Sequence, residues 1–395
     1  MAVLGLRGTG DWGTDERPKD FRETILWRQP NGQAPLTALM GKMGSEKAAD
    51  PEFSWWDEAL DTVRVQSTVA KVNTDTTLTL ASGGDNLVPG DLLMVEKADQ
   101  TLYDNEIVEV SASTATSATI IRGAAGTTAA AIPANSYLTK IGNVFAEGTG
   151  APIATTRNPS KLSNYAQIFK TTYELTNTAK GINNLRTGDP LKNDKKRKMF
   201  DHSISLEWAF MFGRKSETAG PNGKPKRTTA GLRDFIKTNV TVFGAGGANP
   251  VLSIDTFNAA ILPVFNWNTG AGDERLVLAG NKALTALNRL AQGAPGSQVT
   301  HAETIKVYGM QLQRWVLPQG AIYVKTHPLL NTHPIYSSSM FVIDPSSIKY
   351  RYLRDTAFKD NIQANDSDTQ KGQWLTEAGL EVHNEMAMAY LGNVQ

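Results

Sequence analysis

Apolar positions recur with a helical period over residues 190–217, which predicts one long helix, here named the spine helix. Asp189 is suited to the N-cap, and Pro190 to the first helical position, where its missing N–H breaks no hydrogen bond. We expect the helix to end before Gly220-Pro221, a pair that does not continue a helix. Positions spaced by three and four residues form a wide apolar stripe along its second half. They are Met199, Phe200, Ile204, Leu206, Trp208, Phe210, Met211 and Phe212.

Between about residues 62 and 141 the pattern changes from helical to alternating. Short runs rich in Val, Ile and Thr alternate apolar with polar positions, and clusters of Gly, Asn, Asp and Pro separate them. This pattern predicts a compact all-β module, a small barrel or sandwich. The module has no cluster of aromatic and basic side chains, which disfavours a nucleic-acid-binding barrel.

The pattern of apolar and polar positions over residues 245–340 predicts a mixture of helices and antiparallel strands. Residues 253–265 and 281–290 have helical spacing, the first behind a capping serine, and 274–278 predicts a strand. Residues 371–395 alternate by parity over most of their length and predict one long strand. Together with the spine helix and the β module, these elements indicate an α+β fold.

The first 55 residues are rich in Gly and Pro and show almost no period, yet they carry large apolar side chains such as Phe21 and Trp27. A disordered tail would hold fewer such groups. The composition predicts an extended N-terminal arm with two possible docking places. One is a neighbouring subunit, in which case Phe21 and Trp27 are contact residues, and the other is a belt around the chain's own core.

Three further aromatic side chains are candidate contacts between subunits. Trp55 and Trp56 are adjacent, so in an extended segment they face opposite ways, and one can be core while the other is a contact. The alternative is that both are covered inside one subunit. Phe169 lies on a predicted strand that leads back from the β module towards the spine helix.

A basic run, Lys195, Lys196, Arg197 and Lys198, lies in the first half of the spine helix. The helix macrodipole favours acidic side chains there, so the run does not serve the helix itself. It is a candidate basic patch on an inner surface, facing packaged nucleic acid or an acidic partner. A solvated helix face is the simpler explanation.

The amino-acid composition of the chain disfavours several classes of function. The 395 residues carry 40 Lys and Arg against 39 Asp and Glu, a formal net charge of +1, which predicts no strong attraction to nucleic acid or an anionic membrane. The absence of cysteine excludes disulfides and thiolate metal sites and suits a reducing cytoplasm. No apolar run reaches the length of a bilayer-spanning helix, so we expect no membrane partner.

Motifs for catalysis or cofactor binding are weak. Gly8, Gly10 and Gly13 have the GxGxxG spacing but lack the preceding strand and following helix that a dinucleotide site needs. His327 and His333 have no carboxylate nearby in sequence to complete a metal site, which favours loop histidines. Neither GxSxG nor HExxH occurs. We therefore expect no enzyme, no cofactor and no metal.

The chain resembles the major capsid proteins of tailed phages, whose fold is named after phage Hong Kong ninety-seven (HK-97-like). The likeness lies in the order of the elements: arm, β excursion, spine helix, α+β region and late strand. Three segments carry the resemblance. They are LEWAFMFGRKSE, GMQLQRWVLPQGAIYVKTHPLLN and MFVIDPSSIKYRYLRDTAFKDNIQANDSDTQKGQWLTEAGLEVHNEMAMAYLGNV.

The resemblance implies a domain plan for the chain. Residues 1–55 would form the N-terminal arm, and residues 56–180 an extended E-loop enlarged by the all-β module. Residues 181–244, with the spine helix, and 341–395 would form the peripheral domain. Residues 245–340 would form the axial domain, which meets its copies around the five- and six-fold axes.

The resemblance also implies a function: a structural protein that assembles with many copies of itself, as hexamers and pentamers, into the icosahedral head shell around double-stranded DNA. It places the chain in the virion, assembled in the host bacterial cytoplasm, with the DNA contacted weakly and nonspecifically. The arm is too poor in charged helix to be built-in scaffolding, so a separate scaffolding protein is expected, besides a portal and a possible decoration protein. A cellular nanocompartment shell and a phage tail or decoration protein remain alternatives.

Overall fold

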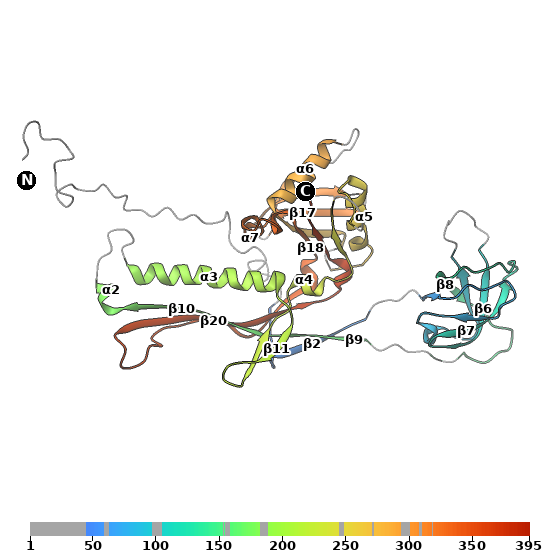
Figure 1. Ribbon diagram of the computed structural model, residues 1–395, viewed down its shortest axis with the longest axis horizontal. Helices are drawn as coiled ribbons and strands as arrows, with labels where there is room; N and C mark the ends of the chain where they lie inside the picture. Colours follow the sequence, from blue (N-terminus) through green and yellow to red (C-terminus); the bar gives the residue numbers. More distant parts are fainter. Residues whose placement is uncertain are drawn as a thin grey trace, which may run out of the picture. The chain divides into compact units, whose positions relative to one another are not determined.

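The computed structural model describes residues 45–58, 63–96, 105–152, 154, 159–181, 189–244, 249–270, 272–293, 301–307, 310–317 and 319–395. The chain divides into two compact units (Figure 1). The first unit comprises Met1–Trp55 and Lys161–Gln395, and the second comprises Trp56–Ser160. The mixture of helices and sheets confirms the α+β prediction.

A four-stranded sheet and one long helix form one part of the first unit. The strands lie in the order β1 (Ser45–Lys47), β19 (Ile348–Lys359), β20 (Thr369–Val382) and β10 (Gln167–Thr176). β1 is parallel to β19, whereas β19, β20 and β10 are antiparallel. The spine helix is α3 (Pro190–Phe212), which runs beside β10 and β20 (Figure 1).

The N-terminus of α3 confirms the sequence prediction. Asp189 is the N-cap, and its side chain accepts hydrogen bonds from the backbone N–H groups of Leu191 and Lys192. Pro190 occupies the first helical position. On the inward face Leu206, Phe210 and Met211 are buried, while Met199, predicted to belong to the apolar stripe, is exposed.

A seven-stranded sheet forms the other part of the first unit. Its order is β13 (Val240–Val242), β21 (Ala389–Gly392), β18 (Met340–Ile343), β14 (Glu274–Ala279), β17 (Gly320–Thr326), β16 (Met310–Leu317) and β15 (His301–Val307). Helices α5 (Ile254–Phe265) and α6 (Asn281–Gly293) pack against one face, in one hydrophobic cluster with the strands. Leu276 and Leu278 of β14 point to the opposite face, into the cluster that includes Phe210 of α3. Burial on both faces explains the nearly continuous apolar run of β14.

The remaining elements of the first unit are short. They are β2 (Glu52–Asp57), whose last two residues belong to the second unit, with its partner β9 (Ser160–Tyr165), the hairpin β11 (Ser216–Ala219) and β12 (Pro225–Thr228), and helices α2 (Asn177–Gly181), α4 (Leu232–Phe235) and α7 (Pro328–Thr332).

The second unit is the predicted all-β module. Its antiparallel strands lie in the order β3 (Arg64–Ser67), β8 (Ser136–Asn143), β5 (Asp91–Val95), β6 (Ile107–Thr114), β7 (Ser117–Ala124) and β4 (Thr77–Thr79). A bridge between Ser67 and Leu80 joins the two edges, which closes the sheet into a small barrel. Its interior holds fully buried Leu78, Leu93, Val108 and Leu138.

The predicted end of the spine helix is wrong. The helix ends at Phe212, and Gly213 follows with ψ 154°, outside the helical region. A Cβ at Gly213 would lie 2.4 Å from the carbonyl oxygen of Ala209 and 2.5 Å from that of Thr229. The close approach of a distant backbone segment therefore requires glycine here. Gly220-Pro221 instead belongs to the turn of the β11–β12 hairpin.

The predicted single strand over residues 371–395 is also wrong. β20 ends at Val382, and Asn384 adopts a left-handed conformation with φ 48°. The chain then enters β21, which belongs to the seven-stranded sheet rather than to the sheet of β20. Both strands are buried, so the apolar pattern continues across the break and parity alone does not reveal it.

Candidate assembly surfaces

The inward face of α3 is fixed to the sheet by a buried histidine. His202 Nδ1 lies 3.0 Å from Thr171 Oγ1 on β10, and its Nε2 lies 2.8 Å from Thr376 Oγ1 on β20. Burial lowers the pKa of His202, which favours the neutral imidazole. A neutral ring is at once a donor and an acceptor, so it can bond to both threonine hydroxyls. The helix is thereby aligned on two strands.

A second buried polar pair joins α3 to α7. Glu207 Oε1 and His327 Nε2 are 2.7 Å apart, and both side chains are completely buried. His327 is the N-cap of α7, where its side chain accepts from the backbone N–H of Leu330. Since Nδ1 accepts, Nε2 carries the proton and donates to Glu207. His327 lies in the connection between β17 and α7, as the expectation of a loop histidine has it, but its side chain is buried in the core.

Two of the predicted contact aromatics are core residues. Trp55 is only 5% exposed, and its ring lies 5.8 Å from that of Phe235 and 6.0 Å from that of His383, centroid to centroid. Phe169 is 7% exposed and packs edge-on against Phe210 of α3. Their own chain covers both rings, which contradicts a contact role for these two side chains.

Trp56 differs from its neighbour, because its side chain is 62% exposed. The opposite orientation of the two adjacent rings follows from the alternation of strand β2. Trp56 therefore stays a candidate contact with another copy. Phe21 and Trp27, the other two candidates, lie outside the described residues.

The structure divides the predicted basic patch on α3. Lys195 Nζ lies 3.6 Å from the ring centroid of Phe358 on β19, and Lys198 pairs with Asp201 at 3.2 Å. Lys196 and Arg197 are exposed. The four cations therefore differ in their surroundings, and their role as a basic patch stays a prediction.

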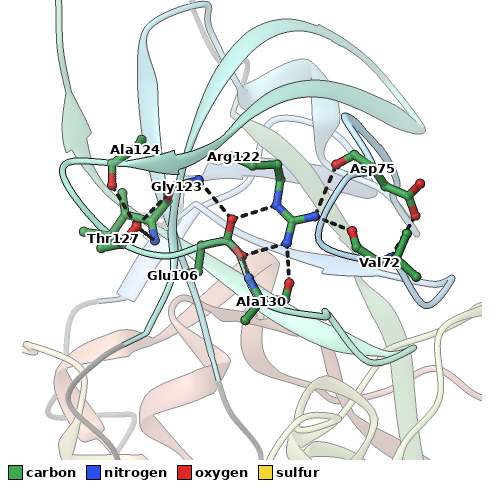
Figure 2. A network of polar contacts seen from close by, with 9 residues as sticks. Val72, Asp75, Glu106, Arg122, Gly123, Ala124, Thr127 and Ala130 are labelled. Carbon is green, nitrogen blue, oxygen red and sulfur yellow. Dashed lines mark hydrogen bonds and ion pairs between the residues drawn. The ribbon is translucent and has the colours of Figure 1, made fainter.

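In the second unit, a buried ion pair holds the loops at one end of the barrel together (Figure 2). Glu106 and Arg122 form two parallel hydrogen bonds, Nε to Oε1 and Nη2 to Oε2, each of 2.7 Å. Glu106 also accepts from the backbone N–H groups of Gly123 and Ala130, each at 3.1 Å. Burial alone would raise the pKa of Glu106, but these hydrogen bonds outweigh it and lower the pKa.

Arg122 uses its remaining donors on backbone carbonyls. Nη1 donates to Val72 O at 2.7 Å and to Asp75 O at 3.2 Å, and Nη2 donates to Ala130 O. One guanidinium thus ties two loop segments, the turn of Val72 and Asp75 and the segment of Ala130, to the carboxylate at the start of β6 (Figure 2). Such a fully satisfied network makes this end of the barrel rigid.

Neither a membrane segment nor a metal cluster is found in the described part of the chain. No helix there combines the length and the hydropathy needed to cross a bilayer. Among the same residues, no group of three or more His, Asp or Glu side chains is placed to hold a metal ion.

Solved capsid structures resemble the chain over nearly its whole length at low identity. The capsid of an empty GTA particle has a TM-score of 0.49 and 10% identity and covers 98% of both chains. The capsid of Myoviridae phage XM1 has a TM-score of 0.47 and 11% identity and covers 95% of this chain and 96% of that one.

Sequence comparison is more decisive. The chain is 26% identical over 397 residues to a major capsid protein of Pseudomonas phage PaMx41, across 95% of this chain and 92% of that protein. The family model described as SU10 major capsid protein matches residues 6–395, which include the inserted β module. The chain therefore belongs to the SU10 major capsid protein family, and it is a structural protein of a phage capsid rather than an enzyme.

Proposed function

We propose that many copies of this chain assemble, as hexamers and pentamers, into the icosahedral head shell of a tailed phage with double-stranded DNA inside. The observation that carries the proposal is the family match over residues 6–395, because it includes both compact units and not one shared module. Exposed apolar side chains such as Trp56, Val251 and Ile335 support it, since assembly would cover them.

An HK-97-like arrangement is part of this proposal. The order of elements supports it: a β excursion, then α3 on the four-stranded sheet, then the seven-stranded sheet with its helices. α3 and the four-stranded sheet would be the peripheral domain, and the seven-stranded sheet the axial domain. β18 and β21 pair within the seven-stranded sheet, so the axial domain would also include strands beyond residue 340.

The partners and the place of assembly complete the proposal. A separate scaffolding protein, a portal and a decoration protein would act beside the shell protein. Packaged DNA would be contacted weakly, which the net charge of +1 supports. Assembly in the host bacterial cytoplasm agrees with a chain that has no cysteine.

Electron microscopy of the purified recombinant chain, with and without the co-expressed scaffolding protein, tests the proposal. We expect closed shells built from five- and six-fold capsomers. A chain that remains a monomer under all assembly conditions, or that forms only tubes lacking five-fold vertices, would contradict it.

A further inference from the structure

The turn of the β11–β12 hairpin contains an asparagine followed by a glycine, and we name residues 220–224 the Asn-Gly turn. Asn222 is the one asparagine directly before a glycine among the residues that the structure describes. Asn222 and Gly223 are both exposed, and a Cβ placed on Gly223 would meet no atom within 4 Å beyond its chain neighbours. The turn is therefore open to solvent and has room for its backbone to move.

Two hydrogen bonds close the Asn-Gly turn. The N–H of Gly220 donates to the carbonyl of Lys224 at 2.7 Å, and that of Gly223 donates to the carbonyl of Gly220 at 2.9 Å. Gly223 has φ 71°, in the left-handed region that glycine adopts at low cost. The turn therefore favours glycine at this position, and the same glycine leaves the backbone nitrogen after Asn222 unhindered by a Cβ.

The side-chain amide of Asn222 is polarised by the backbone. Its Oδ1 accepts a hydrogen bond from the N–H of Lys224 at 3.1 Å. A donor in this position stabilises negative charge on Oδ1 when a nucleophile adds to Cγ, as an oxyanion hole does. The backbone nitrogen of Gly223 is the nucleophile within reach, because its attack on Cγ closes an unstrained imide ring within the chain. The attack requires the exposed hydrogen bond from Gly223 to Gly220 to open.

The charge around the turn favours the same addition. Residues 214–228 carry five Lys and Arg against one glutamate. Arg227 pairs with Glu217 at 2.9 Å, whereas Lys224 and Lys226 are exposed beside the turn. Positive charge at this distance stabilises the anionic intermediate that forms on Asn222.

We propose that Asn222 is a site of spontaneous deamidation through a cyclic imide. The Gly223 nitrogen attacks Cγ of Asn222, so that the N–Cγ bond forms and the bond from Cγ to the amide nitrogen breaks. Ammonia leaves with the proton of the Gly223 N–H. Water then opens the imide: its addition to Cγ gives aspartate at position 222, and its addition to the backbone carbonyl carbon gives isoaspartate. Water is the only co-reactant.

The modification changes both the charge and the backbone of the hairpin. Either product adds a carboxylate to this basic segment. Isoaspartate also adds a methylene group to the main chain, so the two hydrogen bonds that close the turn cannot both keep their geometry. We therefore expect β11 and β12 to pair less stably in chains that carry isoaspartate.

Peptide mapping of the folded full-length chain tests the proposal. Chains are incubated in heavy-oxygen water at neutral and at mildly alkaline pH, then digested in ordinary water and analysed by mass spectrometry. The heavy label separates deamidation of the folded chain from deamidation during digestion. We expect one heavy oxygen at position 222, and at least about tenfold more of this product than at Asn135, an exposed turn residue that precedes serine. The rate should rise with pH, because the attacking nitrogen must lose its proton.

Three variants separate this reaction from simple exposure. Gly223→Ala should lower the rate at Asn222 at least about tenfold, because a Cβ hinders the attacking nitrogen. Lys224→Pro removes the N–H that donates to Oδ1 and should also lower the rate. Lys224→Gln keeps this N–H, is the matched control, and should have a much smaller effect.

Several results would overturn the proposal. They are equal rates at Asn222 and Asn135, an unchanged rate in Gly223→Ala, and labelling of Asn222 only after the chain is denatured. Equal rates in Lys224→Pro and Lys224→Gln would contradict the part assigned to the donated N–H. The comparison of Asn222 with Asn135 needs no substitution, so it decides the question even where a variant does not fold.

Discussion

Replacement of Arg122 by methionine should destabilise the inserted β module far more than the same replacement at Arg64. Both arginines pair with a glutamate in the same barrel, but their surroundings differ. The side chains of the Arg122–Glu106 pair are 7% and 2% exposed, whereas those of the Arg64–Glu96 pair are 48% and 25% exposed. Arg64→Met is therefore a matched control in the same unit.

The size of the loss in stability depends on which polar groups each replacement leaves without a hydrogen-bond partner. Without Arg122, the buried Glu106 carboxylate keeps only two backbone donors, and the carbonyls of Val72, Asp75 and Ala130 each lose the hydrogen bond from the guanidinium. Breaking a buried ion pair in this way costs roughly 3–5 kcal/mol. Loss of the exposed pair costs about 0–1 kcal/mol. For a unit of this size, 1 kcal/mol shifts the melting temperature by roughly 4–8 °C, so the two variants should be well separated.

Hydrogen exchange on the full-length chain measures the effect locally. In Arg122→Met, peptides from residues 105–130 should lose protection, while peptides from α3 keep theirs. The double variant Arg122→Met with Glu106→Gln should recover part of the stability, because no buried charge is left without a partner. Equal loss of protection in Arg122→Met and Arg64→Met would refute the reasoning that burial determines how much an ion pair contributes to stability.

Three further predictions concern the first unit, each measured by chemical denaturation of the full chain. Burial lowers the pKa of His202 in the folded protein, so the unfolded state binds the proton more readily. The free energy of unfolding should therefore fall as the pH drops below about 6.5, the ordinary pKa of histidine. His202→Gln should weaken this pH dependence. Gly213→Ala should cost about 1–3 kcal/mol, since the new Cβ would meet two carbonyl oxygens, whereas no loss would show that the backbone yields easily. Asp189→Ala should cost about 1 kcal/mol through the lost N-cap of α3, and a smaller loss for Asp189→Asn would confirm the capping role.

Features that depend on neighbouring residues could be predicted from the sequence. Asp189 and Pro190 set the start of α3, and Ser253 with Thr256 forms a capping box that starts α5. The strands of the β module were predicted for the same reason, since alternation and turn clusters are local signals. In each case the physical cause lies within a few residues of its effect.

Features that depend on distant segments could not be predicted. Glu207 and His327 are 120 residues apart, and no local pattern shows that they form a buried pair. The end of α3 at Gly213 also has a distant cause, because the backbone of Thr229 passes close to it. Arg122 and Glu106 are only 16 residues apart, but their contact depends on the register of the β6–β7 hairpin.

The tryptophan pair shows how contact residues of an assembling protein should be sought. Adjacency alone predicts that Trp55 and Trp56 face opposite ways, but not which of them the fold covers. Phe235 and His383 decide this, and both lie far along the chain from Trp55. Aromatic character alone does not separate the two rings, whereas exposure after folding leaves Trp56 as the candidate contact. A side chain that its own fold leaves uncovered is a stronger indication of a contact between copies than aromatic character alone.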